Sequence, residues 1–288
     1  MDDYRKGLLI VGFGALLFAP DSLMLRLMAM EQWPTVFWRG LLSGVIFTTA
    51  FLVIRRTRLI ADIRALGPAA IIFTIFFSST TICFVYAVRE TSVANTLFLV
   101  STSPLFSALL SWAFLGEQPD RRTWRTILLA MIGIAIIAFG HAGDAELKPN
   151  RRLGDLAAIG AAISLAISFV VARRVRPRAM TPLIGPAGLL SAAIAFMLAG
   201  DLAIPQGSLW PLLVMAVVIM PVATFCLTIG PRYIPAPEVS LLLLVEAVTA
   251  PLLIWAALGE RPGQATLIGG AIILSAIAWS AAERMRPS

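Results

Sequence analysis

Three ionisable residues, Asp21, Arg39 and Glu246, interrupt long apolar stretches of this 288-residue chain. A charged side chain at the centre of a membrane span costs about 2.5–3.5 kcal/mol on insertion scales, whereas each Leu, Ile, Phe or Val returns about 0.3–0.6 kcal/mol. One such residue does not prevent insertion, but it should face a cavity or a partner of opposite charge. Glu246 could therefore bind a substrate ammonium or exchange a proton, and Arg39 could bind a substrate carboxylate through two parallel hydrogen bonds.

Each of the three residues also has a purely structural interpretation. Glu246 could be a protonated acid that ties helices together. Asp21 could pair with Arg26 or Arg39 or lie at the membrane interface, and Arg39 could anchor the outer boundary of its helix. Pro20, directly before Asp21, removes a backbone hydrogen bond, and interrupted helices often line transport paths. The sequence leaves both interpretations open for each of these candidate cavity residues.

Polar, aromatic and proline residues in the same stretches extend the candidate set. Ser79 and Asn95 could contact a substrate or bond neighbouring helices, and the Tyr86 hydroxyl needs a partner at membrane depth. Aromatic residues that could line a cavity, or form an interfacial belt in the case of the two tryptophans, are Trp33, Trp38, Phe84, Tyr86 and Phe98. Candidate hinges are Pro20, Pro104, Pro221 and Pro251, although proline is also common in membrane helices in general.

Membrane-spanning helices must position these residues, because the composition excludes a soluble or disordered chain. Hydrophobic residues make up 59% of the chain and charged residues 14%, with a mean hydropathy of +0.88, against about 45–50% and 25% in globular proteins. A helix needs about 20 apolar residues to cross a bilayer. Stretches without any Asp, Glu, Lys or Arg are 66–88, 91–116, 126–140, 156–172, 179–200, 202–231 and 262–282, and stretches with one or two are 8–28, 34–54 and 237–258. We therefore predict an all-α polytopic membrane protein with ten transmembrane helices, since barrel strands would be shorter and alternating.

The same sequence argues against several kinds of chemistry. One histidine, His141, and two cysteines within apolar stretches, Cys83 and Cys226, cannot form a usual zinc site. Neither lysine, Lys6 nor Lys148, follows a Gly-rich phosphate-binding loop. The chain also lacks G-x-S-x-G and H-E-x-x-H motifs. We therefore expect no metal, no cofactor and no enzymatic activity, with an intramembrane enzyme as a remote alternative. We also expect no nucleic-acid partner, because the residues that give the net charge of +7 lie in short loops.

Arginines in the short loops predict the orientation in the membrane. They are Arg55, Arg56, Arg58 and Arg64; Arg121, Arg122 and Arg125; Arg173, Arg174, Arg176 and Arg178; and Arg284 and Arg286. All fall on one side of a ten-helix chain, which places both termini in the cytoplasm, whereas Lys148, Arg151 and Arg152 fall outside. We interpret every arginine cluster as a topology signal rather than a ligand site. The apolar stretch after Arg5 and Lys6 lacks a cleavage site, so it is interpreted as a first spanning helix and not as a signal peptide.

An internal repeat with an offset of 143 residues divides the chain. The motif LGEQP at 115–119 recurs as LGERP at 258–262, and the residue pairs that match at the same offset are Cys83 with Cys226, Arg89 with Arg232, Trp112 with Trp255, and Ser103 with Glu246. Five spans separate the copies, so the halves should insert with opposite topology and share a site near the midplane. We predict a first five-helix repeat at 1–143, a connecting loop at 144–152 and an inverted second repeat at 153–288. Small residues should form packing surfaces between helices; they are Gly133, Gly140, Gly154, Gly160, Ala161, Ala162, Gly269 and Gly270.

These motifs resemble the ten-helix EamA-type branch of the drug/metabolite transporter superfamily. The resemblance rests on the two Gly-Glu-x-Pro ends, on Ser103-Pro104 and Val245-Glu246 before them, and on the aromatic-x-Arg pattern at 37–39. One departure is Ala247, where the family often has proline after the glutamate, so the helix break at that depth should be softer. The resemblance implies a multi-pass protein of the bacterial inner membrane that works by alternating access through a central cavity.

The resemblance also implies a substrate class. Length and layout look most like bacterial amino-acid exporters, including those for aromatic amino acids. The expected function is export of small amphipathic metabolites, chiefly amino acids, with a multidrug or lipophilic-cation exporter as the alternative. The partners are then the lipid bilayer and a small solute. Proton coupling and the oligomeric state are left open.

Overall fold

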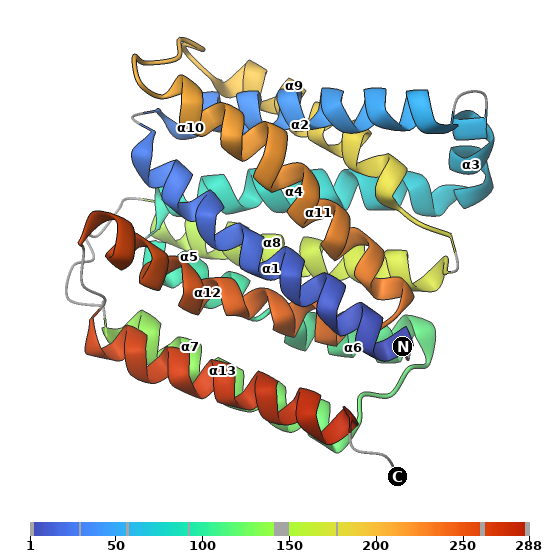
Figure 1. The fold of residues 1–288 in the computed structure, drawn as a ribbon, viewed down its shortest axis with the longest axis vertical. Helices are drawn as coiled ribbons and strands as arrows, with labels where there is room; N and C mark the ends of the chain where they lie inside the picture. The colour runs from blue at the N-terminus through green and yellow to red at the C-terminus, as the bar shows by residue number, and fades with distance from the viewer. Residues whose placement is uncertain are drawn as a thin grey trace.

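The structure is a computed structural model that describes residues 3–28, 30–55, 58–91, 93–140, 150–176, 178–259 and 263–285. His141, Lys148, most of the predicted connecting loop and the segment 260–262 of the second motif lie outside the described residues, as do the side chains of Arg26 and Arg89. Within the described residues the fold is a bundle of helices without strands (Figure 1). This confirms the predicted all-α class.

Ten helical segments are long and apolar enough to cross a membrane, as predicted. They are Asp3–Leu25, Gln32–Ile54, Pro68–Ala87, Asn95–Leu115, Arg121–Phe139, Arg151–Arg174, Thr181–Leu198, Leu209–Arg232, Ala236–Leu258 and Gln264–Glu283. Helices are the expected solution because each backbone N–H and C=O must find its partner within the segment when no water is present.

Individual helices and short helical segments make up these spans, in chain order. They are α1 (Asp3–Leu27), α2 (Gln32–Arg55), α3 (Arg58–Leu66), α4 (Pro68–Glu90), α5 (Val93–Val100), α6 (Ser103–Leu115), α7 (Arg121–Gly140), α8 (Arg151–Arg174), η2 (Thr181–Leu183), α9 (Ile184–Leu198), α10 (Leu209–Leu213), η3 (Val214–Ile219, a π-helix), α11 (Met220–Ile229), η4 (Gly230–Arg232), α12 (Ala236–Leu258) and α13 (Gln264–Met285). The fourth span therefore consists of α5 and α6, and the eighth of α10, η3, α11 and η4.

Two of the four candidate hinges lie at interruptions of the helix. Pro104 follows the turn between α5 and α6, and Pro221 lies in the first turn of α11 directly after the π-helix η3. Proline fits the first turn of α6 because its missing N–H has no intrahelical partner there. Pro221, by contrast, follows helical residues directly, so its missing N–H removes a bond to the preceding turn, at the point where the π-helix ends. Pro20 and Pro251 instead lie inside helices that continue past them, α1 and α12. α12 also runs unbroken through Ala247, in line with the softened break expected there.

One helix was not predicted. Sequence reasoning interpreted the arginines between the second and third spans as a loop, whereas Arg58–Leu66 forms the short helix α3. Gly67, with φ of +56°, then reverses the chain so that Pro68 can begin α4. α3 is too short to span a bilayer, which is why a search for long apolar stretches passes over it.

The main helix contacts of one half have matching contacts between the corresponding helices of the other half. α1 packs on α11 and α12, and its counterpart α8 packs on α4 and α6. α2 packs on its counterpart α9, and α7 on its counterpart α13, at opposite edges of the bundle in Figure 1. This pattern is consistent with the predicted pair of repeats.

Small residues allow the closest of these contacts. A Cβ atom added to Gly133 of α7 would lie 2.6 Å from the carbonyl oxygen of Gly269 in α13. Gly40 of α2 similarly faces the backbone of Gly188 in α9, at 2.7 Å. Gly154 approaches the backbone nitrogen of Thr91. The predicted use of small faces for packing inside the bundle is therefore confirmed at Gly133, Gly154 and Gly269, whereas the contact between Gly40 and Gly188 was not predicted.

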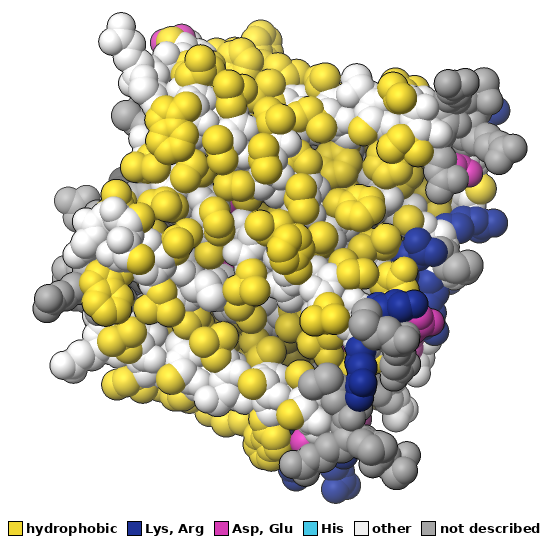
Figure 2. Space-filling model, in the orientation of Figure 1, with side chains coloured by type: hydrophobic (Ala, Val, Ile, Leu, Met, Phe, Trp, Pro, Cys, Tyr) yellow, Lys and Arg dark blue, Asp and Glu magenta, His cyan; other side chains and the backbone are white. Residues whose placement is uncertain are grey.

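Charged and apolar side chains are segregated along the helix axes. On the face shown in Figure 2, hydrophobic side chains cover the sides of the bundle and Lys and Arg gather at one end. Figure 1 shows the start of α1 and the end of α13 at that same end. We call it the basic end, defined by Arg121, Arg122, Arg125, Arg173, Arg174, Arg176 and Arg178. Arg151 and Arg152 lie at the opposite end, because α8 separates them from Arg173 by its length of roughly 36 Å at 1.5 Å per residue.

Candidate functional site

Asp21 and Arg39 form an ion pair inside the bundle. The Arg39 Nη2 atom lies 3.0 Å from Asp21 Oδ2 and 3.0 Å from the sulfur of Met220. The Asp21 side chain is only 5% exposed and that of Arg39 20% exposed. The structure thus selects one of the alternatives that the sequence left open, namely Arg39 as the partner of Asp21.

A third helix brings this pair together. α11 and the adjoining η3 pack on both α1 and α2, and Met220 begins α11. Asp21 lies roughly 27 Å along α1 from Asp3 and Arg39 roughly 10 Å into α2, at 1.5 Å per residue. The pair therefore lies in the half of the bundle away from the basic end. Met220 comes from the second repeat, so the site joins the two halves.

The pair keeps hydrogen-bonding capacity for another molecule. Asp21 Oδ1 is buried and has no hydrogen-bond partner among the described residues. A carboxylate accepts about four hydrogen bonds and a guanidinium donates five. A solute that carries both an ammonium and a carboxylate could therefore bind here while Asp21 and Arg39 each keep an opposite charge beside them.

The other predicted site residues lie in several different places. Asn95 donates from Nδ2 to Asp155 Oδ1 of α8 at 2.5 Å and to Thr91 Oγ1 at 3.3 Å, which is the interhelical role. Tyr86 is half-buried beside Trp33 and Val36, in a core cluster with Ala195. The structure does not bring these two residues to the Asp21–Arg39 pair through any contact of the described residues.

The remaining three candidates lie on α4, α6 and α12. Ser79 is half-buried on α4, and Ser103 is buried at the first residue of α6. Glu246 is half-buried about 15 Å into α12, near the middle of that span. α6 and α12 pack together through a cluster that contains Ala108 and Leu244. Ser103 and Glu246 therefore lie on two helices in mutual contact, as expected for counterparts near the axis between the halves.

The two tryptophans interpreted as either cavity or belt residues contact protein. Trp33 is 8% exposed within the cluster just described. Trp38 donates from Nε1 to the carbonyl oxygen of Leu202 at 3.0 Å and packs edge-on against Phe37. Both side chains thus hold α2 in place.

Sequence reasoning missed a second charged cluster, at the basic end. Arg173 was interpreted as one of four loop arginines, yet it is 8% exposed at the end of α8. Its Nε lies 3.0 and 3.2 Å from the two carboxylate oxygens of Glu117, and its Nη1 donates to the carbonyl oxygen of Pro231 at 3.1 Å. Arg176 Nη2 lies 3.6 Å from Glu117 Oε1. The signal available in the sequence was Glu117, which belongs to the repeated motif.

The repeated motif explains how Glu117 reaches this cluster. Gly116 and Gly259 hold the same place in the two copies, and both end a helix, α6 and α12, with φ of +68° and +76°. Glycine adopts this left-handed conformation without a steric penalty, so it stops the helix and turns the chain aside. Glu117 then leaves the helix axis and meets Arg173.

A cavity of about 340 Å³ lies beside this ion pair. Its lining comes from the end of α6, the start of α7, the end of α8 and the start of α12. The lining residues are Ser111, Glu117, Gln118, Pro119, Asp120, Thr123, Arg173, Pro235 and Pro237. Ser111 is 1% exposed, and its hydroxyl has no hydrogen-bond partner among the described residues.

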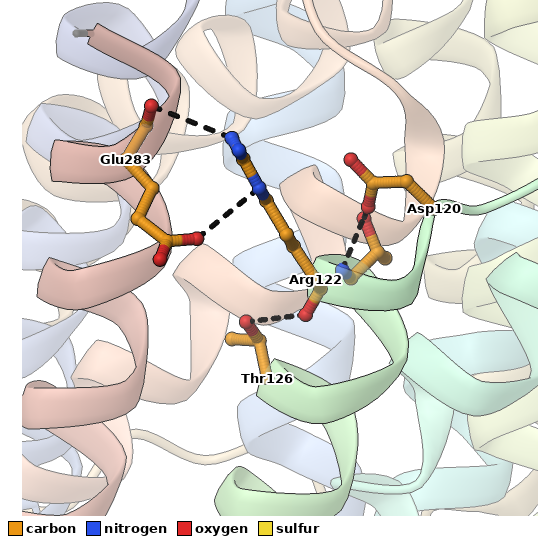
Figure 3. Close-up of polar contacts among 5 residues, drawn as sticks. Asp120, Arg122, Thr126 and Glu283 are labelled. Carbon is orange, nitrogen blue, oxygen red and sulfur yellow. Dashed lines mark hydrogen bonds and ion pairs between the residues drawn. The ribbon is translucent and has the colours of Figure 1, made fainter.

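Further polar contacts lie at the same end of the bundle, and two of them join the two halves. Asp120 caps α7, since its Oδ1 accepts from Thr123 N at 2.8 Å and Thr123 Oγ1 at 2.7 Å. Arg122 lies 3.2 Å from Glu283 Oε2 of α13 through Nε and 3.4 Å from the Glu283 carbonyl oxygen through Nη1 (Figure 3). Tyr4 donates to Glu238 Oε2 at 2.8 Å. Among the described residues, no group of three or more His, Cys, Asp or Glu side chains could hold a metal ion.

Comparison with known proteins gives a consistent family assignment. The model of the EamA-like transporter family matches residues 5–139 and again residues 152–282. The chain is 25% identical over 254 residues to the uncharacterized transporter YdfC of Bacillus subtilis, which covers 83% of this chain and 79% of YdfC. It is 31% identical over 97 residues to the uncharacterized transporter YetK of the same organism, a match that spans 34% of this chain and only 29% of YetK.

A solved crystal structure shares the fold. It superposes with a TM-score of 0.82 at 17% sequence identity and covers 98% of this chain and 99% of its own. At that identity the likeness concerns the arrangement of the helices alone.

Proposed function

The chain belongs to the EamA-like transporter family, and we propose that it exports small amphipathic metabolites, chiefly amino acids and aromatic ones among them, by alternating access. In this proposal the basic end faces the cytoplasm of a bacterial inner membrane, as the excess of arginine there favours. The Asp21–Arg39 pair then lies in the outer half of the membrane. Glu246 lies at the midplane, where the family resemblance puts the central cavity.

The buried Asp21–Arg39 pair is the observation that carries this proposal. An ionised residue at membrane depth costs about 2.5–3.5 kcal/mol, and such residues usually mark a solute path. The pair touches Met220 of the second half, so it lies where the two halves must separate if the outer end opens. A purely structural helix bundle has no need of such a costly contact between its halves.

An amino acid offers both charges that this site can receive. Its ammonium can bind Asp21 Oδ1, which has no partner among the described residues, and its carboxylate can bind Arg39 bidentately. The aromatic part of the substrate class rests on the family resemblance, because the apolar cluster of Tyr86, Phe37 and Trp33 is built between α2, α4 and α9 and contains neither Asp21 nor Arg39. Glu246 provides a further acid for the ammonium or for a proton.

Flux through proteoliposomes tests the proposal. Purified protein would be reconstituted with labelled L-phenylalanine and L-leucine, with and without an imposed pH gradient, beside protein-free vesicles. We expect saturable flux, and its response to the gradient identifies proton coupling. Arg39→Lys keeps the charge but loses the planar fork, so it should reduce amino-acid flux at least tenfold while the protein stays folded. Arg64→Gln, at an exposed residue of α3, is the matched control and should leave flux unchanged.

Two outcomes would contradict the proposal. Folded protein that moves no amino acid but moves a lipophilic cation would identify the alternative exporter class. Undiminished amino-acid flux in Arg39→Lys would remove this residue from the substrate site.

A further inference from the structure

We propose that the cavity beside Arg173 and Glu117 is a second solute site, which binds a small zwitterion by exchanging partners with that ion pair. This inference rests on the proposed function, since it gives the transported solute a first binding place at the basic end. It also restricts the substrate class to molecules that carry an ammonium and a carboxylate together.

The cavity has the size and the lining of a site for a small polar solute. Its volume of about 340 Å³ lies at the lower end of the roughly 300–1,000 Å³ typical of ligand pockets. Glu117 and Asp120 supply acceptors for an ammonium, and Arg173 supplies donors for a carboxylate. Glu117 and Asp120 come from the connection between α6 and α7 in the first repeat, and Arg173 comes from the end of α8 in the second.

Ser111 gives an independent indication of a ligand. Its side chain lines the cavity and is 1% exposed, and its hydroxyl has no hydrogen-bond partner among the described residues. Buried hydroxyls are nearly always hydrogen-bonded. A serine in a helix commonly bonds to the carbonyl four residues earlier, and Ser168 does so with Ser164 at 2.8 Å. A solute in the cavity would give the Ser111 hydroxyl the partner that its own helix does not.

Arg173 links the two halves of the protein at this cavity. It belongs to α8, it binds both oxygens of Glu117 from the end of α6, and it donates to Pro231 at the end of the eighth span. A solute ammonium that takes the place of the guanidinium at Glu117 releases the segment after α6 from the end of α8, while the packing of α6 on α8 is kept. The solute carboxylate then occupies Arg173, so no ion is left without a partner.

This exchange discriminates between kinds of solute. A lone cation at Glu117 leaves the buried Arg173 guanidinium without an opposite charge, and a lone anion at Arg173 leaves the half-buried Glu117 with Arg176 alone, 3.6 Å away. An unpaired buried charge is strongly unfavourable. A zwitterion replaces both partners at once, so it alone opens this ion pair without that penalty.

Protection of an introduced cysteine from alkylation tests the site directly. Gln118 lines the cavity and is exposed, so Gln118→Cys, in a background where Cys83 and Cys226 are serine, reports on occupancy in purified protein. Millimolar L-phenylalanine should slow its reaction with a maleimide at least fivefold. Phenethylamine and 3-phenylpropionate, which carry one charge each, should protect less than twofold. Gln206→Cys, in the exposed segment before α10, is the matched control and should show no protection.

Substitutions then separate a binding site from a structural latch. Ser111→Ala breaks no hydrogen bond among the described residues and should weaken protection about threefold to tenfold, whereas Glu117→Gln should abolish it. Glu283→Gln removes the Arg122 ion pair at the same end (Figure 3) but does not line the cavity, and it should leave protection intact. If the Arg173–Glu117 ion pair had only a structural role, Glu117→Gln would lower the stability of the protein, but the concentration of L-phenylalanine needed for protection would not change.

The same assay separates this inference from the proposed function. Protection that persists in Arg39→Lys, where flux is reduced, would show that the solute binds in the cavity beside Arg173 independently of the Asp21–Arg39 pair. Protection without amino-acid flux in the wild type would retain the site and refute the exporter. Absence of protection by L-phenylalanine, or equal protection by either single-charge analogue, would overturn the inference even if flux is observed.

Discussion

Replacing Arg39 with Gln should lower the free energy of unfolding by about 3–5 kcal/mol. This is the range for breaking a buried ion pair by removing one partner, because the other charge is left without compensation. Here that charge is Asp21, whose side chain is 5% exposed. Its Oδ1 atom already lacks a hydrogen-bond partner among the described residues, and the substitution removes the Arg39 guanidinium from Oδ2 as well.

A double-mutant cycle isolates the contribution of the pair. The variants are Arg39→Gln, Asp21→Asn and the combination of both, unfolded at equilibrium in mixed micelles by increasing sodium dodecyl sulfate. The double variant should lose less than the sum of the single losses, with a coupling energy of about 0.5–3 kcal/mol. Arg64→Gln, at an exposed arginine of α3, should stay within about 0.5 kcal/mol of the wild type.

Either of two results would refute this reasoning. A loss below about 0.5 kcal/mol for Arg39→Gln would mean that the 3.0 Å contact contributes nothing to stability. Strictly additive losses in the double variant would mean that Asp21 and Arg39 act on separate neighbours.

Three further outcomes can be measured with the same material. Gly133→Leu should destabilise the protein by about 1–3 kcal/mol in the same unfolding assay, since a Cβ there meets the α13 backbone at 2.6 Å; Gly12→Ala, with no other atom within 4 Å of the added carbon, should not. Glu246→Gln should alter amino-acid flux while membrane insertion and yield match those of Glu31→Gln at an exposed residue, and an unfolded product would instead establish a structural role. A cysteine at Asn150, in a cysteine-free background, should react with an impermeant maleimide from outside intact cells, and labelling only after lysis would reverse the proposed orientation.

The sequence was sufficient for the ten spans because bilayer insertion depends on local composition. The stretch 202–231 carries no charge, and the part of it that can cross the bilayer, from Leu209 on, satisfies its backbone polar groups as helix. The helix ends at Gly116 and Gly259 are also a local property of the sequence, because only glycine adopts φ near +70° readily. The short helix α3 was not foreseen because a search for long apolar stretches passes over nine residues, and the π-helix η3 was not foreseen because an apolar stretch does not distinguish hydrogen-bond patterns within a helix.

The site was only partly predictable, because charge pairing depends on which helices meet. Asp21 had three possible environments in the sequence, and the packing of α11 against α1 and α2 selects Arg39 as its partner. Asn95 had two, and the approach of α8 selects the hydrogen bond to Asp155.

Arg173 shows most clearly where local information ends. In the sequence it is one of four arginines that follow the sixth span, and each of them satisfies the charge rule for orientation equally well. Its partner Glu117 lies 56 residues earlier in the chain. Only the contact between α6 and α8 buries this arginine against that carboxylate and leaves a cavity beside it. Hydrophobicity along the chain thus determined the spans, whereas the charged sites were decided by tertiary packing, since an ion pair needs two side chains that the sequence keeps far apart.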